Sequence, residues 1–490
     1  MAVAGRARYR FELYERLEKN RARIMEQISR VPDQVGVPAE MKGAAGLLGG
    51  SGCHATLRKA VSDAMDAGSR RLISLKDLDA ELRRVVKDIY GDRYDAIAVN
   101  TCEAGLHVAF DALVSPPIAG RGEPYRACYV APYERHIHHQ AGYGRPFPPM
   151  YKDITSDRGV TAGEYGMLGK RLAGLETVLV RLAGADYTVH GIKSHPCTLL
   201  LNVDPQGSIA ALRRAAEVHA SSLAAFASMA YNTPGYGYGV HDADGAPVLQ
   251  KLMGSLAREY GVPYITDNAR GTPALGVDPG KIGADVMVYS TDKAFCGPTG
   301  GLVIGLEEPM SALRRALGVH SQRWGTTAAH GKSAYVAFDP GKEALLGIIK
   351  SLELLRDDPD QFTRPVDDMY AIVAEEFAGI GPEWLRRGLV ITKSYNQLAV
   401  EINYENTWKG RDWGFPIFTI EDMYAGSNLL QSALPAMGFV AGLLAYDANI
   451  VMGPAVGTAD ENGQLIEGRM RPLIKCLVRV MEVIASYVDA

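Results

Sequence analysis

Short apolar runs alternate with amphipathic stretches through the middle of the chain, which predicts strands alternating with helices. Runs that suit buried strands occur at 96–99, 128–131, 178–182, 198–203, 223–229, 262–266, 286–289 and 302–304. Apolar residues at helical spacing occur between them, at 106–113, 163–177, 209–220 and 248–260. This order is typical of an α/β fold with a largely parallel sheet and helices on both faces. Ligands of such sheets bind at the strand ends.

Further helical patterns flank this region and divide the chain. They occur at 7–30, 55–90, 309–317, 342–356 and 366–377, and short strands are expected at 389–391 and 397–402, with a helix after the stretch 462–472. A glycine-rich segment, 41–52, separates the first two helical patterns. We therefore expect an N-terminal arm over 1–60, an α/β domain over 61–340, and helices leading to a smaller α+β domain over 341–490.

Composition narrows the class of protein. A chain of 490 residues with 47% hydrophobic and 22% charged residues is typical of a soluble protein with more than one domain. No apolar run approaches the roughly 18 residues that cross a bilayer, and the charged N-terminus predicts a cytoplasmic protein. The net charge of −4 gives no electrostatic footprint for nucleic acid. The six cysteines form no C-x-x-C pair, which argues against a zinc site and a disulfide framework.

A lysine follows the apolar run 286–289 at the mouth of a buried strand. Lys293 comes after Ser290, Thr291 and Asp292, and a turn rich in glycine and proline follows it. Partial desolvation makes an amine easier to deprotonate, and a neutral amine is what a Schiff base with an aldehyde requires. A solvated lysine in a β-turn is the alternative.

Two other strand ends carry polar groups that suit a ligand. The run 262–266 leads into Asp267, and the run 96–99 leads into a polar turn that precedes the helix at 106–113. A strand, a polar turn and a helix start form a phosphate cradle, because the unpaired N–H groups point at the anion.

Phosphate cradle, strand-end aspartate and strand-end lysine, in that order, resemble the fold-type-I family of pyridoxal 5′-phosphate enzymes over about residues 60–350. The S-T-D-K motif ending at Lys293, with G-P-T-G-G-L-V-I-G after it, is most similar to the selenocysteine-synthase branch. That branch includes L-seryl-tRNA selenium transferase and sugar-amine ammonia-lyases. The stretch 341–349 is similar to it as well. The resemblance implies a fold-type-I large domain, a small domain, and pyridoxal 5′-phosphate as cofactor.

The resemblance assigns the two central roles to Lys293 and Asp267. Lys293 would hold the cofactor as a Schiff base and then serve as general base at Cα. Asp267 would pair with the pyridine nitrogen, and Ala269 would contact the cofactor beside it. A protonated ring is the better electron sink for a Cα carbanion.

The phosphate would be held by the backbone amides of Thr101, Cys102 and Glu103 and by the Ser290 hydroxyl, with Thr291 adding a hydroxyl contact. Glu103 departs from the pattern, because a carboxylate beside a phosphate is unfavourable unless it points away or pairs with a cation.

Other strand ends supply candidates for the cofactor ring. His136 or His138 would stack on the pyridine ring, and Asn232 would donate a hydrogen bond to its phenolic oxygen. Surface histidines and an ordinary turn are the alternatives. Three histidines within 136–139 form no metal site by spacing, because no carboxylate or cysteine completes the set. The glycine-rich segment 41–52 is either a plain linker or a cover over the site.

Arginines are the candidates for substrate binding, because the guanidinium fork matches a carboxylate. Arg469 and Arg471 lie in the expected small domain, and Arg323 lies in a polar loop that can reach a neighbouring subunit. The family normally completes its sites across a two-fold interface, so we expect at least a homodimer.

The expected activity is that of a lyase or transferase. It would act on an amino acid or amine through a Cα carbanion, with β-elimination or replacement as the leading reaction. Transamination, decarboxylation and aldol cleavage are the alternatives within the same chemistry. A non-catalytic scaffold is the alternative of another class, against which the Asp267–Lys293 pair argues. A tRNA-dependent role is disfavoured by the acidic net charge.

Overall fold

A computed structural model describes most of the chain. The described residues are 12–48, 55–114, 128–132, 150–151, 160–161, 176–182, 193–199, 205–220, 223–229, 241–317, 338–418, 426–440, 444–446 and 448–488. The chain forms two compact units: a larger one of residues 59–359, and a smaller one that combines residues 1–58 with residues 360–490. Each unit is described by itself below.

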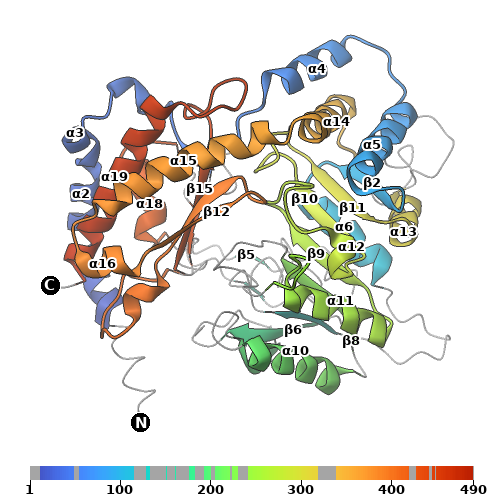
Figure 1. The fold of residues 1–490 in the computed structure, drawn as a ribbon, viewed down its shortest axis with the longest axis horizontal. Helices are drawn as coiled ribbons and strands as arrows, with labels where there is room; N and C mark the ends of the chain where they lie inside the picture. The colour runs from blue at the N-terminus through green and yellow to red at the C-terminus, as the bar shows by residue number, and fades with distance from the viewer. Residues whose placement is uncertain are drawn as a thin grey trace. The chain divides into compact units, whose positions relative to one another are not determined.

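The larger unit is built on an eight-stranded sheet (Figure 1). Its strands, in spatial order, are β2 (Tyr94–Val99), β11 (Gly301–Leu306), β10 (Val286–Ser290), β9 (Tyr264–Asn268), β8 (Leu223–Met229), β3 (Cys128–Pro132), β6 (Glu176–Leu182) and β7 (Lys193–Leu199). β11 runs antiparallel to both of its neighbours, and the other pairings are parallel. A separate pair joins β4 (Met150–Tyr151) to β5 (Val160–Thr161). The predicted α/β class with a mostly parallel sheet is confirmed.

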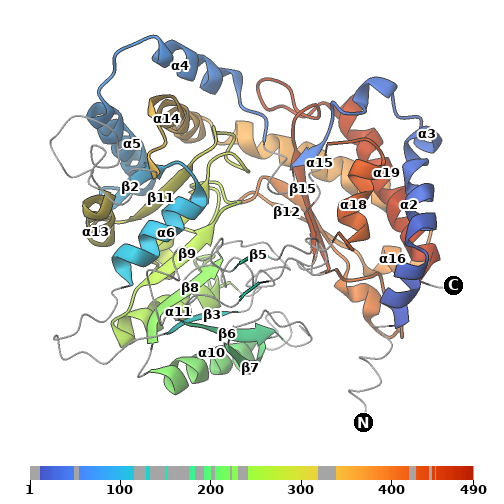
Figure 2. The same cartoon turned by 180° about the vertical axis from the view of Figure 1, so that it is seen from behind.

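Helices cover both faces of this sheet, as the opposite views in Figures 1 and 2 show for α6 and α11. The helices described in the larger unit are α4 (Lys59–Ser69), α5 (Leu75–Tyr90), α6 (Cys102–Leu113), α10 (Pro205–His219), α11 (Val248–Tyr260), α12 (Pro279–Ile282), α13 (Glu307–Leu317) and α14 (Lys342–Asp357). Alternate strand residues such as Ile97, Val288 and Val303 pack with α6 and α13 in one core. Their neighbours point to the other face, where Tyr264 and Tyr289 are also buried. Burial on both faces explains why these strands are continuous apolar runs in the sequence.

A glycine lets α6 approach the sheet closely. A Cβ atom at Gly105 would lie 2.7 Å from Cγ1 of Val288 and 3.0 Å from Cγ2 of Val303. Such contacts are too short, so the helix could not stay at this distance with a larger residue. Gly105 therefore fixes how near the first turn of α6 lies to the ends of β9 and β10.

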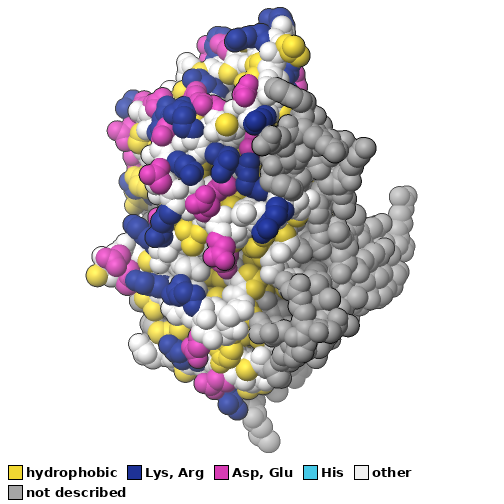
Figure 3. Space-filling view, turned by 90° about the vertical axis from the view of Figure 1, so that its right-hand side faces the viewer, with side chains coloured by type: hydrophobic (Ala, Val, Ile, Leu, Met, Phe, Trp, Pro, Cys, Tyr) yellow, Lys and Arg dark blue, Asp and Glu magenta, His cyan; other side chains and the backbone are white. Residues whose placement is uncertain are grey.

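The surface of the larger unit carries both charges in alternation. On the described part of the face in Figure 3, Lys and Arg side chains are interspersed with Asp and Glu. On α5, Arg84 pairs with Glu81 and Asp88, and Asp88 also pairs with Arg356 of α14. Exposed pairs of this kind contribute little to stability.

The smaller unit combines antiparallel strands with helices, and the predicted small α+β unit is confirmed. Its sheet has the order β1 (Leu47–Leu48), β15 (Asn449–Pro454), β13 (Ala399–Asn403) and β12 (Val390–Ser394), and β14 (Leu444–Tyr446) also pairs with β15. Its helices are α2 (Arg21–Ser29), α3 (Val31–Val35), α15 (Asp360–Ala378), α16 (Glu383–Gly388), α18 (Leu429–Ala436) and α19 (Glu467–Ser486), with short 3-10 turns at Ala39–Met41 and Glu405–Trp408. Helix α2 packs against α18 and α19, so the N-terminal segment is part of this unit.

Part of the glycine-rich segment 41–52 is a strand. Leu47 and Leu48 pair antiparallel with Pro454 and Gly453 of β15. Residues 49–54 lie outside the described residues. The middle of the segment is therefore an edge strand of the small sheet.

Helix α15 begins six residues before the predicted start at residue 366. Pro365 lies inside the observed helix, although proline has no N–H to donate within a helix. The carbonyl of Gln361 is therefore left without its helical donor. Nη2 of Arg58 donates to that carbonyl at 3.1 Å. A residue 303 positions away thus replaces the missing hydrogen bond.

Candidate functional site

Three chain segments meet at one edge of the large sheet. Strand β9 ends there with Asp267 and Asn268, and the adjacent β10 ends with Ser290, three residues before Lys293. Strand β2 ends at the same edge, because Gly301 of β11 pairs with Ser290 on one side and Val99 on the other. Helix α6 begins directly after β2, so its first turn lies over this edge.

Asp267 is a buried carboxylate with one oxygen satisfied. Its side chain is 4% exposed, and Oδ1 accepts a hydrogen bond from the Ala269 amide at 2.9 Å. Oδ2 has no hydrogen-bond partner among the described residues. Burial raises the pKa of Asp267 to about 6, while the Ala269 N–H and the charge of Lys293 oppose this and Glu103 adds to it. An ionised Asp267 therefore lacks one donor.

Lys293 lies in the closed turn that joins β10 to β11. The Thr291 amide donates to the Gly300 carbonyl at 3.0 Å, and the Gly297 amide donates to the Thr291 carbonyl at 2.8 Å. The Thr291 hydroxyl donates to the Pro298 carbonyl at 2.5 Å. The lysine is half-buried, and no hydrogen bond joins its amine to the described residues. Its charge acts on Asp267, so the two groups predicted to work together lie within electrostatic range.

The hydroxyl of Ser290 is committed within the turn. It donates to Oδ1 of Asp292 at 2.7 Å, and both side chains are buried. We predicted that Ser290 binds a phosphate, for which the hydroxyl would have to turn away from Asp292. Thr291 was predicted to contact the phosphate as well, and its proton is held by the Pro298 carbonyl. Both hydroxyls therefore shape the lysine turn in this structure.

The first turn of α6 has the form of an anion site. Thr101 is the N-cap, and its Oγ1 accepts from the Ala104 amide at 3.0 Å. The amides of Thr101, Cys102 and Glu103 make no hydrogen bond within the described part of the chain. The helix N-terminus also carries partial positive charge. The Glu103 side chain is exposed. This agrees with the expectation that its carboxylate would point away from a phosphate bound here.

The thiol of Cys102 points to the aspartate rather than to solvent. Its Sγ lies 4.0 Å from Oδ1 of Asp267, and the side chain is 2% exposed. Sequence reasoning assigned only the backbone amide of Cys102. The signal that could have found the thiol is its place as first residue of a helix that packs on the strand ends.

Four of the predicted site residues, His136, His138, Asn232 and Arg323, lie outside the described residues. Arg469 and Arg471 both lie at the start of α19 in the smaller unit.

The two arginines differ in their partners. The guanidinium of Arg471 is shared by Glu375, Glu376 and Glu467, each at 2.8 Å. A substrate carboxylate would have to displace one of these glutamates. Arg469 is exposed and donates to the Gly457 carbonyl at 3.3 Å, so it is the less committed of the two.

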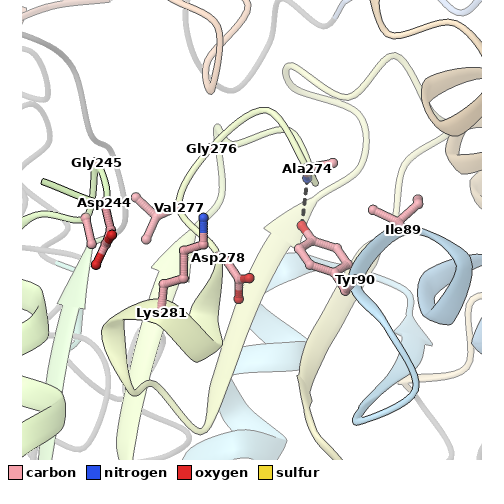
Figure 4. A pocket seen from close by; sticks show the side chains of 10 residues that line it. Ile89, Tyr90, Asp244, Gly245, Ala274, Gly276, Val277, Asp278 and Lys281 are labelled. Carbon is pink, nitrogen blue, oxygen red and sulfur yellow. Dashed lines mark hydrogen bonds between the residues drawn. The ribbon is translucent and has the colours of Figure 1, made fainter.

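A cavity lies on the face of the large sheet opposite α6 (Figure 4). It has a volume of about 250 Å³ and is lined by Ile89, Tyr90, Asp244, Gly245, Ala246, Ala274, Gly276, Val277, Asp278 and Lys281. The Tyr90 hydroxyl accepts from the Ala274 amide at 2.7 Å and lies 3.4 Å from the hydroxyl of Tyr289. Tyr289 follows Val288 in β10, so its side chain lies on the face of the sheet away from α6. None of the residues that line this cavity is a predicted site residue.

Among the described residues, no group of three or more His, Cys, Asp and Glu side chains is placed to hold a metal ion. No helix among them is both long enough and apolar enough to span a membrane.

Comparison with known proteins gives structural likenesses only. No family model matches the sequence, and no curated protein matches it. Similar solved structures include the SepCysS–SepCysE N-terminal domain complex, with 12% identity, 92% of this chain and 97% of that chain covered, and a TM-score of 0.49. D-glucosaminate-6-phosphate ammonia-lyase has 16% identity, coverage of 94% and 98%, and a TM-score of 0.45. Alanine–glyoxylate aminotransferase from Nostoc sp. has 12% identity, coverage of 89% and 95%, and a TM-score of 0.49. These are distant similarities that extend over most of the chain.

Proposed function

We propose that this chain is a pyridoxal 5′-phosphate-dependent enzyme that acts on an amino acid or amine. One observation carries the proposal: the buried Oδ2 of Asp267 lacks a donor at the strand end next to the Lys293 turn. A protonated pyridine nitrogen would supply that donor and a positive charge. A buried carboxylate that gains such a partner becomes more readily ionised.

The other end of the cofactor fits the first turn of α6. The unpaired amides of Thr101, Cys102 and Glu103 would donate to the phosphate, and the exposed Glu103 carboxylate would stay away from it. Ring nitrogen and phosphate would thus be bound by groups that lack partners among the described residues. The remaining predicted contacts, from either His136 or His138 and from Asn232 and Ala269, complete the proposal at the ring.

Lys293 would hold the aldehyde carbon of the cofactor through Nζ. When bound, the cofactor supplies an electron sink that stabilises negative charge at the substrate's Cα. Asp267 would keep the ring nitrogen protonated, and the amine of Lys293 would move the Cα proton of the substrate. The closed turn around Thr291 holds the lysine backbone in place while its side chain moves.

For the reaction itself we propose β-elimination or replacement, as the S-T-D-K motif at Lys293 implies. Transamination, decarboxylation and aldol cleavage use the same first steps. A panel of amino acids and amino sugars separates these outcomes, because elimination releases ammonia whereas transamination consumes an added α-keto acid. Arg469 and Arg323 remain the candidates for the substrate carboxylate.

Reductive labelling tests the proposal directly. The full-length protein is incubated with pyridoxal 5′-phosphate, reduced with borohydride, digested and mapped by mass spectrometry. We expect a pyridoxyl label on Lys293 that is lost, together with turnover, in Lys293→Ala. The exposed Lys281→Ala serves as the matched control and should keep the label on Lys293. Absence of a label from Lys293 in the wild-type protein would contradict the proposed function.

A further inference from the structure

One residue touches both ends of the proposed cofactor site. Cys102 presents its backbone amide at the first turn of α6 and its thiol to the carboxylate of Asp267. The thiol reaches Asp267 because Gly105 brings α6 close to Val288, which pairs with Asp267 in the next strand. Side chains of a helix also tilt toward its N-terminus, which is the direction of the strand ends here.

The thiol can only act as a donor at this position. Burial raises the pKa of the Cys102 thiol well above its ordinary value, and the charges of Asp267 and Glu103 raise it further, while Lys293 opposes them. A protonated thiol beside an ionised carboxylate offers its S–H, which is a weak donor. The charged groups that act on Asp267 are Lys293, which favours its ionised form, and Glu103, which disfavours it.

The two oxygens of Asp267 are therefore unequal. The Ala269 amide nitrogen lies 2.9 Å from Oδ1, and Sγ of Cys102 lies 4.0 Å from the same oxygen. No described residue donates a hydrogen bond to Oδ2. We propose that the Cys102 thiol is a positioning residue that holds Oδ1 and so presents Oδ2 to the ring nitrogen. This inference rests on the proposed function and assigns to the side chain a role separate from that of the amide.

The test compares a substitution of Cys102 that keeps a hydrogen-bond donor with one that only fills the space of the thiol. Cys102→Val fills the space without an S–H, whereas Cys102→Ser keeps a hydroxyl donor. Cys476→Val is the matched control, since Cys476 is a buried thiol of α19 in the smaller unit. The probe is 4′-deoxypyridoxine 5′-phosphate, which carries the ring nitrogen and the phosphate but has no aldehyde to react with Lys293. Its dissociation constant is measured calorimetrically between pH 5 and pH 8.5.

Removal of a donor from a carboxylate raises the pKa of that carboxylate. The affinity for the probe should change with pH around the pKa of Asp267. In Cys102→Val this inflection should therefore lie about half a pH unit higher, with about threefold weaker binding near pH 6. It should stay at or below the wild-type position in Cys102→Ser and be unchanged in Cys476→Val. An inflection in Cys102→Val that equals the wild-type one overturns the inference. So does the same shift in Cys102→Ser, because filling rather than donation would then matter.

Failure of the proposed function gives a different result. If the wild-type protein does not bind the probe at any pH, the cofactor assignment is wrong. The Cys102–Asp267 contact is then decided in the protein alone, from the pH dependence of its urea unfolding. The free energy of unfolding should fall as Asp267 ionises, and Asp267→Asn should abolish this fall. In Cys102→Val the fall should occur at higher pH than in the wild-type protein. A fall at an unchanged pH would overturn the contact.

Discussion

At the scale of single residues, Asp267 combines burial with incomplete hydrogen bonding. A carboxylate that is 4% exposed and has a donor on only one oxygen is costly to ionise. The neighbouring Lys293 offsets part of this cost. Groups held in this way are frequent at functional sites, where the missing partner comes from a ligand. The cost is therefore measurable in the protein without cofactor.

Asp267→Asn should stabilise the cofactor-free protein at pH 8 and much less at pH 4. Burial raises the pKa of Asp267 from 3.8 to about 6, so the folded state binds more protons than the unfolded chain between these values. Stability that depends on this group falls as the pH rises through that window, by on the order of 2–3 kcal/mol. Urea unfolding of both proteins at several pH values measures the difference.

The exposed Asp412→Asn is the control for loss of a charge. It should change stability little, and by the same amount at both pH values. If the gain in the free energy of unfolding from Asp267→Asn does not grow between pH 4 and pH 8, then ionisation of Asp267 does not destabilise the folded protein. Whatever its effect on stability, Asp267→Asn should lose cofactor affinity, because an amide cannot balance the charge of the protonated ring.

At the scale of elements, the packing of α6 on the sheet sets the site. Its first turn lies over the ends of β9 and β10 because Gly105 leaves no side chain between helix and sheet. Gly105→Ala should therefore cost a net amount of about 1–2 kcal/mol, since overpacking outweighs the better helix propensity of alanine. It should also weaken binding of inorganic phosphate at the first turn. Denaturant unfolding and phosphate titration measure the two effects.

A second helical glycine provides the comparison. A Cβ atom at Gly468 in α19 would have nothing within 4 Å, so Gly468→Ala should be neutral or slightly stabilising. If Gly105→Ala behaves like Gly468→Ala in both measurements, then close packing of α6 is not what positions its first turn.

Much of the large sheet could be predicted because its strands are buried on both faces. The strands that end near Val99, Met229, Asp267 and Ser290 are apolar runs bounded by polar turns, and all four were expected. Helix starts were less predictable. α6 begins at Cys102 rather than at residue 106, because Thr101 caps it through the Ala104 amide. The small strands β14 and β15 were not expected; they pair with each other, and β15 also pairs with β1 and β13, which lie farther away in sequence.

The candidate site could be predicted in part. Lys293 and Asp267 stand out in sequence because each follows an apolar run, and the structure places them at neighbouring strand ends. The Cys102 thiol was missed because its contact depends on how closely α6 packs. The glutamates around Arg471 were missed for a similar reason: Glu375 and Glu376 belong to another helix.

At the scale of the whole molecule, Arg58 joins segments that are far apart in sequence. It donates to the carbonyl of Gln361 that Pro365 leaves unpaired and to the Asn462 carbonyl at 2.6 Å, and it stacks 4.0 Å from the ring of Phe362. Arg58→Ala should lower the free energy of unfolding by about 2–3 kcal/mol, because buried carbonyls lose a charged donor. Thermal and urea unfolding measure the loss.

Pro365→Ala provides a coupled test of the same contact. Alanine restores the helical N–H, so the cost of Arg58→Ala should be smaller in the Pro365→Ala background. Arg364→Ala, an exposed arginine on the same helix, is the control and should have little effect. Equal costs of Arg58→Ala in both backgrounds would mean that Arg58 does not act through the Gln361 carbonyl.

The assembly state is a further prediction at this scale. Sites of the resembled family are completed across a two-fold interface, so we expect the active protein to be at least a homodimer. Sedimentation velocity at the concentration of the activity assay measures this. A species that is active and has the mass of one 52.9 kDa chain would contradict the prediction.

The smaller unit is built from both ends of this sequence, and this has a consequence for synthesis on the ribosome. The apolar side chains of the first helices, among them Leu17, Ile24 and Ile28, are buried in a unit whose other helices include α18 and α19. These residues are translated before their partners, which emerge more than 400 residues later. At about 5–20 residues per second, the nascent segment waits tens of seconds with its apolar face uncovered. A newly made chain should therefore be a client for holding chaperones until α19 has emerged from the ribosome.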